Sequence, residues 1–174
     1  MRNKLLFKRF SQCCFPTENE PLTNCFSVWS DGSLYYEYRE YKNPEEAEIE
    51  FLAELLRHKK IKSKKKLILK STQLSEDIKS ILNKYENEIS GLLSNPDLVN
   101  IWVADGYTDF IQFENKVIWG HNILSVLPYK KETDINSLSE EQRKNDYSLA
   151  MLSKIYLEIE DVVNYFVSTQ ISAK

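Results

Sequence analysis

Apolar residues recur along this chain at two spacings, and each spacing predicts a different kind of element. Between residues 26 and 38, aromatic and β-branched residues alternate on both sides of Asp31-Gly32. This pattern predicts a β-hairpin closed by a two-residue type I′ turn, because that turn needs the positive φ angles that Asp-Gly tolerates. The pairs expected across the two strands are Trp29 with Leu34 and Val28 with Tyr35.

Helical spacing of three to four residues appears in three stretches. Asn43-Pro44 predicts the start of a helix that ends near His58. Ser75-Glu76-Asp77 predicts the start of a second helix, with a left-handed C-cap at Gly91. A capping box at Ser139-Glu-Glu-Gln142 opens the third helix, which should run from Glu140 to about Val167 and span roughly 40 Å. The apolar stripes are Ile78, Ile81, Leu82, Tyr85 and Ile89 in the second helix, and Leu149, Leu152, Tyr156, Ile159, Val163 and Phe166 in the third.

Short β-rich blocks separated by turn residues occupy the region after residue 97. The blocks Leu98–Ala104, Phe110–Phe113 and Lys116–Trp119 predict an antiparallel meander with turns at Asp105-Gly106 and Glu114-Asn115. Ile123–Leu127 should add a strand before Pro128, and Lys130–Leu138 should form a polar loop. Leu67-Ile68-Leu69 fits either a strand or an anchoring loop.

Together these elements predict the fold class α+β, with an antiparallel β-sheet (hairpin plus meander) packed against two or three amphipathic helices and a long C-terminal helix. The length of 174 residues fits a single domain over residues 1–174, of which 1–22 are expected to be irregular or flexible. Lys8 and Arg9 interrupt the only early apolar stretch, and no window approaches ~18 uninterrupted apolar residues. We therefore expect a cytoplasmic protein with no membrane partner.

Charge is distributed unevenly along the chain, although the formal net charge is only −3. Between Arg57 and Lys70 there are eight Lys or Arg and no acidic residue, which leaves 15 basic against 26 acidic residues elsewhere. An acidic body of this kind attracts cationic proteins and repels nucleic acid.

No catalytic or metal-binding signature stands out. Cys13, Cys14 and Cys25 form no CxxC pair, and the four glycines form no phosphate-binding loop. His121, oriented by an acid such as Asp105 or Asp109, is the one candidate general base, but a hydrogen-bonded turn histidine is the more common role for such a residue. We expect a protein that is not an enzyme and holds no cofactor and no metal.

An acidic and aromatic loop in the meander region is the predicted partner-binding site. The segment 71–129 carries eight acidic residues against three lysines, together with several aromatic residues. Aromatic anchors surrounded by complementary charge suit an interface with a basic protein. The residues predicted to contact the partner are Asp105, Tyr107, Asp109 and Glu114.

In overall character the chain resembles the immunity proteins that neutralise bacterial polymorphic toxins, including those of contact-dependent growth inhibition. The likeness rests on a small α+β domain, an acidic body, abundant Asn, Ile and Lys, and the aromatic hairpins Trp29-Ser-Asp-Gly32 and Trp102-Val-Ala-Asp-Gly106. The resemblance implies a bacterial, cytoplasmic toxin inhibitor. Its partner would be a toxin C-terminal domain, often a nuclease, whose basic active site the inhibitor occludes.

Two other functions remain open. The basic segment Lys59–Lys70 could contact phosphates as part of a nucleic-acid-associated regulatory protein, although it lacks interleaved aromatic residues and nucleic acid is not the expected partner. An enzyme centred on His121 is the third possibility, and the sequence names no substrate for it.

Overall fold

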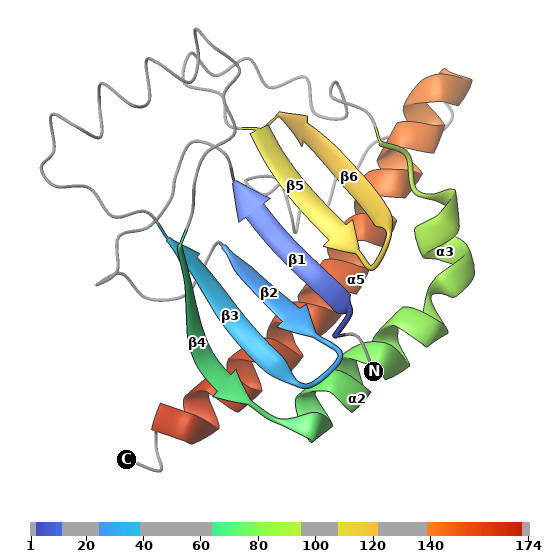
Figure 1. Cartoon of the computed structure of the whole chain (residues 1–174). Helices are drawn as coiled ribbons and strands as arrows, with labels where there is room; N and C mark the ends of the chain where they lie inside the picture. The colour runs from blue at the N-terminus through green and yellow to red at the C-terminus, as the bar shows by residue number, and fades with distance from the viewer. Residues whose placement is uncertain (1–2, 12–24, 39–63, 95–107, 122–138, 172–174) are drawn as a thin grey trace, which may run out of the picture.

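One layer of strands and one layer of helices make up the part of the chain that the structure describes. The computed structural model describes residues 3–11, 25–38, 64–94, 108–121 and 139–171. Within these ranges, six strands form one antiparallel sheet in the order β4-β3-β2-β1-β5-β6 (Figure 1). The strands are β1 (Leu5–Ser11), β2 (Phe26–Trp29), β3 (Ser33–Tyr38), β4 (Lys64–Lys70), β5 (Thr108–Phe113) and β6 (Lys116–His121).

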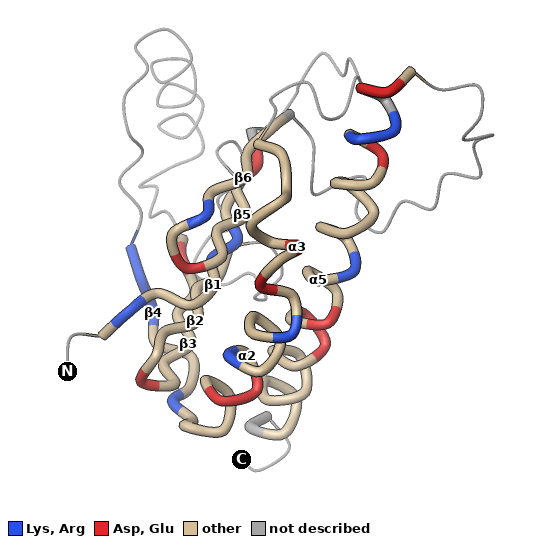
Figure 2. The backbone as a smooth tube through the Cα atoms, turned by 90° about the vertical axis from the view of Figure 1, so that its right-hand side faces the viewer, with Lys and Arg blue, Asp and Glu red and all other residues tan. Residues whose placement is uncertain are grey.

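The described helices all pack against the same face of the sheet (Figures 1 and 2). They are α2 (Thr72–Lys84), α3 (Glu86–Gly91) and α5 (Glu140–Ile171). With 32 residues, α5 is about 48 Å long and crosses behind the strands, which confirms the α+β class and the long C-terminal helix. Among the described helices, none is apolar over enough of its length to cross a bilayer.

The hairpin predicted around Asp31-Gly32 is present as β2 and β3, but the predicted register is wrong by one residue. Val28 pairs with Leu34, and Ser27 pairs with Tyr35. Within this loop, Gly32 alone has a positive φ, at +81°, and its N–H donates to the Trp29 carbonyl at 2.9 Å. The connection is therefore a three-residue loop with a left-handed glycine at its end, and not a type I′ turn.

The expectation of an irregular or flexible start over residues 1–22 is corrected at Leu5–Ser11, which form β1 in the middle of the sheet. Its charged residues obscured the strand pattern in the sequence. Each of them has a partner in the fold: Lys8 Nζ lies 3.0 Å from Glu37 Oε2, and Arg9 Nη1 lies 3.1 Å from Glu160 Oε1.

The second predicted helix is two helices in the structure. It begins three residues earlier than predicted, because the Ser71 hydroxyl caps α2 by accepting from the Leu74 N–H at 3.4 Å. It breaks at Tyr85, whose φ of −113° and ψ of 22° are not helical. Gly91 lies inside α3 without a positive φ, so the predicted left-handed cap is wrong.

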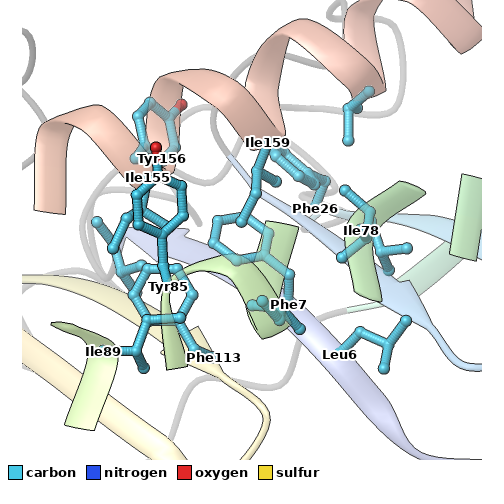
Figure 3. Close-up of a cluster of buried hydrophobic side chains, with 14 of the residues drawn as sticks. Leu6, Phe7, Phe26, Ile78, Tyr85, Ile89, Phe113, Ile155, Tyr156 and Ile159 are labelled. Atoms are coloured by element: carbon cyan, nitrogen blue, oxygen red, sulfur yellow. The ribbon is translucent and has the colours of Figure 1, made fainter. Parts of the chain in front are cut away.

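One continuous apolar core fills the space between the sheet and the helices (Figure 3). Phe7 stands at its centre and is fully buried, with its ring centroid 5.6 Å from that of Phe26, 5.5 Å from that of Phe113 and 6.4 Å from that of Tyr156. The predicted stripe of α5 faces this core, which confirms the periodicity argument. Its buried members are Leu152, Tyr156, Ile159 and Val163, and its partly buried members are Leu149 and Phe166.

The two blocks Phe110–Phe113 and Lys116–Trp119 lie within β5 and β6, as predicted, and Leu67-Ile68-Leu69 is part of a strand. Four other predicted elements lie outside the described residues. They are the helix after Asn43-Pro44, the strands Leu98–Ala104 and Ile123–Leu127, and the loop Lys130–Leu138.

Candidate functional site

The four residues predicted to contact a partner do not come together in the described part of the chain. Asp105 and Tyr107 lie outside the described residues. Asp109 lies in β5 and is only 3% exposed, whereas Glu114 is exposed in the turn between β5 and β6, with a φ of +47°. Five residues along a strand separate these two by about 17 Å. Their role in partner binding stays a prediction.

Asp109 belongs to a buried polar cluster that joins the sheet to α5. Arg9 Nη1 lies 3.1 Å from Glu160 Oε1, to which the Tyr156 hydroxyl also donates a hydrogen bond at 2.5 Å. The Arg9 guanidinium lies 4.8 Å from the centre of the Tyr156 ring. Burial lowers the pKa of Arg9, although Glu160 and Asp109 oppose that shift, and burial raises the pKa of Glu160. The cluster anchors α5 on β1 and explains why an acidic residue is buried at Asp109.

A second polar cluster links α2 to α5 at the protein surface. Lys84 Nζ lies 2.9 Å from Glu158 Oε2, and the Tyr85 hydroxyl donates a short hydrogen bond to Glu158 Oε1. Burial tends to raise the pKa of Glu158, but the hydrogen bonds from Tyr85 and Lys84 together lower this pKa below its usual value. The hydrogen bond to Glu158 raises the pKa of Lys84. These contacts hold the helices in one arrangement.

The two layers of the fold carry opposite net charge. The described helices hold ten Asp or Glu against five Lys or Arg, whereas the described strands hold seven Lys or Arg against two Asp or Glu. Figure 2 shows much of this separation, with β4 blue over most of its length and most of the red along the helices. Residues 64–70 of the basic segment Lys59–Lys70 form the edge strand β4.

A groove lies between α3 and the N-terminal half of α5, and we call it the α3–α5 groove. It has a volume of about 440 Å³. Leu93 and Tyr147 line it and are 37% and 62% exposed. Its other lining residues are Gly91, Glu140, Arg143, Lys144 and Ser148.

The charged residues that line the α3–α5 groove are Glu140, Arg143 and Lys144, and further acidic residues lie elsewhere on α3 and α5. The stretches 86–93 and 140–148 together carry five acidic residues and two basic ones. Lys144 also pairs with Glu140 at 3.1 Å, so part of the positive charge is compensated. The acidic residues are Glu86, Glu88, Glu140, Glu141 and Asp146.

Sequence reasoning missed Leu93 and Tyr147, although one signal pointed to Tyr147. This tyrosine lies off the apolar stripe of α5, so the helical spacing already placed an aromatic side chain on the exposed side of an amphipathic helix. Nothing in the sequence indicated that Leu93 would lie beside it.

The described residues do not form a catalytic or metal-binding site around the other candidates from the sequence, His121 and the cysteines. The backbone of His121 ends β6, opposite Thr108, and its side chain lies outside the description. Cys13 and Cys14 also lie outside it, and Cys25 is buried. Within the described ranges, no three His, Cys, Asp or Glu side chains gather as metal ligands would.

Comparison with known proteins finds no match for this chain among family models, curated proteins or solved structures.

Proposed function

We propose that this chain is a non-enzymatic binding protein that acts as a cytoplasmic immunity protein. It neutralises a cognate toxin domain by docking its acidic helix layer against the basic active-site surface of that domain. The observation that carries the proposal is the α3–α5 groove, which an exposed tyrosine and an exposed leucine line, formed by stretches 86–93 and 140–148 that together carry five acidic residues and two basic ones.

Binding energy at protein interfaces comes mainly from a few anchoring side chains, among which tyrosine is enriched. Tyr147 supplies such an anchor, and Leu93 supplies an apolar wall against which a partner side chain packs. The carboxylates carried by α3 and α5 speed the encounter with a cationic surface and disfavour acidic partners. This combination supports a basic protein as the partner.

The groove is built on elements that the core holds in place. Ile89 and Leu92 are buried on one side of it, and Ser148 and Leu152 are buried on the other. A surface held this way loses little conformational entropy on binding, and such preorganisation favours tight association.

The test begins with a partner purified together with the tagged chain from its own cells and identified by mass spectrometry. The purified partner is then titrated with the chain by calorimetry at low and high salt, and its nuclease activity is measured against the molar ratio. We expect one-to-one binding that weakens with salt, and loss of nuclease activity at equimolar chain.

Two tyrosines of α5 provide matched variants for this titration. Tyr147→Ala should weaken binding by about 30-fold, as expected for an anchor worth about 2 kcal/mol. Tyr165→Ala removes an equally exposed tyrosine (64% against 62%) outside the groove and should leave the affinity unchanged.

Charge reversal tests the electrostatic part of the proposal. Changing Glu86, Glu88 and Glu141 together to Lys should slow association and abolish the decline of affinity with salt. Glu114→Lys makes the same change at the site predicted from sequence. If only Glu114→Lys weakens binding, the partner uses the β5–β6 turn and the groove assignment is wrong. If the partner is acidic or keeps its activity, the immunity function is wrong.

A further inference from the structure

The face of the sheet turned away from the helices carries its own set of aromatic and basic side chains, which we call the open face. Side chains alternate along a strand, and Phe7 and Arg9 of β1 contact α5. Lys8 and Phe10 therefore lie on the other side. Following the strand pairing from these two residues gives the remaining members in the other strands: Ser27, Trp29, Tyr35, Glu37, Lys65, Leu67, Phe110, Gln112, Val117 and Trp119.

Strand pairing aligns the open face into rows that run across the whole sheet. One row crosses all six strands in register: Leu67, Tyr35, Ser27, Lys8, Gln112 and Val117. Next to it, Phe10, Phe110 and Trp119 pair across β1, β5 and β6. With neighbouring strands about 4.8 Å apart, the distance from β4 to β6 is about 24 Å.

Lysines and aromatic rings of the open face contact one another. Lys65 Nζ lies 5.1 Å from the centre of the Trp29 ring, which meets the Tyr35 ring edge-on at a centroid distance of 6.5 Å. Lys8 Nζ lies 4.9 Å from the centre of the Phe10 ring. The lysines of the basic segment Lys59–Lys70 have no aromatic residues between them in the sequence. In the folded sheet, Trp29 of β2 and its neighbour Tyr35 of β3 lie beside Lys65, and Phe10 of β1 lies beside Lys8.

Among the described residues of the open face, the accessible charged side chains are lysines. The acidic residue of this face, Glu37, has a side chain only 2% exposed and lies 3.0 Å from Lys8 Nζ and 3.4 Å from Lys65 Nζ. The side chains of the two lysines are 27% and 43% exposed. Both lysines pair with this buried carboxylate while their own side chains stay partly exposed.

Apolar side chains at the two edges of the open face are also accessible. Trp119 and Val117 on β6 are 38% and 41% exposed, and Leu67 on β4 is 51% exposed. Trp119 supplies an exposed ring on β6, and Lys8 and Lys65 lie beside the half-buried rings of Phe10 and Trp29. Together they provide both parts of a single-strand platform, since bases stack on rings and phosphates pair with cations.

We propose that the open face binds single-stranded nucleic acid. Bases stack on Trp119 and its aromatic neighbours while phosphates contact Lys8 and Lys65. The width of the face accommodates about four nucleotides, the lower end of the site sizes known for such surfaces. This proposal is independent of the immunity function, because the two sets of residues lie on opposite layers of the fold.

An acidic peptide is the other polyanion that the lysines could attract. It would gain from Lys8 and Lys65 but has no planar bases to stack on Trp119 and Tyr35, so the aromatic half of the face favours nucleic acid. Poly-glutamate of matched charge therefore serves as the competitor in the test.

The test measures fluorescence anisotropy of fluorescein-labelled dT12 and rU12 with the full chain at 50 and 200 mM salt. We expect saturable binding whose affinity falls as the salt concentration rises. Poly-glutamate should displace the labelled oligonucleotide only at a much higher concentration than an unlabelled oligonucleotide does. Trp119→Ala should weaken binding about 5- to 150-fold, the range that loss of one base stack produces. Lys65→Met keeps the aliphatic stem of the lysine and should reduce the slope of log affinity against log salt by about 0.7.

Helix-layer variants serve as matched controls, and circular dichroism confirms that each variant is folded. Lys79→Ala removes an exposed lysine of α2, and Tyr165→Ala removes an exposed aromatic residue of α5, so neither should change binding. The proposal is overturned if no saturable binding occurs at 50 mM salt. It is also overturned if poly-glutamate competes equally, or if folded Trp119→Ala and Lys65→Met bind as tightly as the unmodified chain.

Discussion

Gly32 is the position where one added methyl group should disturb the described fold most. Its φ is +81°, and a Cβ placed on it would lie 2.0 Å from the carbonyl oxygen of Ser71 and 2.4 Å from the carbonyl carbon. Backbone atoms cannot yield as a flexible side chain would. The substitution Gly32→Ala must therefore push the β2–β3 loop and the start of α2 apart.

The cost of Gly32→Ala follows from what the Gly32–Ser71 contact holds together. A left-handed conformation costs an alanine about 1–2 kcal/mol. Separation of the backbones removes the hydrogen bond from the Ser71 N–H to the Gly32 carbonyl, 3.0 Å long, which contributes about 1 kcal/mol. It also disturbs the cap that Ser71 provides to the Leu74 N–H, which contributes about 1 kcal/mol more. The free energy of unfolding should fall by about 3 kcal/mol.

Equilibrium urea unfolding followed by circular dichroism measures this loss. With a slope of about 2 kcal/mol per molar urea, the midpoint of Gly32→Ala should fall by about 1.5 M at unchanged slope. Gly91→Ala is the control, because a Cβ there meets nothing within 4 Å and the residue is helical. It should raise the midpoint slightly, by about 0.3 M, since alanine favours the helix. Equal midpoints for the two variants would refute the backbone-contact argument.

Three further outcomes follow from burial and charge. Ile155→Ala should lower the free energy of unfolding by about 2–5 kcal/mol in urea titrations, because the side chain is fully buried and leaves a cavity. The hydrogen bond from Lys70 lowers the pKa of Asp31 to about 2. The ionised Asp31 carboxylate should therefore stabilise the fold above pH 3.8, and this stabilisation should be lost as the pH falls towards 2. NMR titration of the carboxyl measures the pKa, and the stability of Asp31→Asn should depend less on pH in this range. Burial raises the pKa of Glu160, so stability should decline as the pH rises from 4.5 through the raised value, and Glu160→Gln should remove that decline from a series of urea titrations between pH 4 and 8.

Local patterns in the sequence were sufficient to predict the elements whose stability comes from near neighbours. The apolar stripe of α5, the hairpin of β5 and β6 and the existence of the β2–β3 hairpin all follow from spacing and turn residues. The register of the β2–β3 hairpin did not follow, because Asp31-Gly32 is compatible with both a two-residue and a three-residue loop.

The place of β1 in the sheet depends on contacts between residues far apart in the sequence. Phe7 pairs with Val28 on one side and with Phe113 on the other, and no local periodicity reports such pairs. The charged residues Lys8 and Arg9 argue against a central strand until Glu37 and Glu160 are seen to neutralise them. The same long-range contacts bury Asp109, which sequence reasoning placed on an accessible loop.

The sequence by itself determined the α+β class, the amphipathic helices and the uneven charge, because each of these is a property of residues close together along the chain. Only the tertiary structure decided where the charges meet aromatic surfaces. Packing of α3 on α5 placed Leu93 beside Tyr147, and pairing of β4 with β3 brought Lys65 over Trp29. Surfaces of this kind form between elements, so their chemistry exists only after the chain has folded.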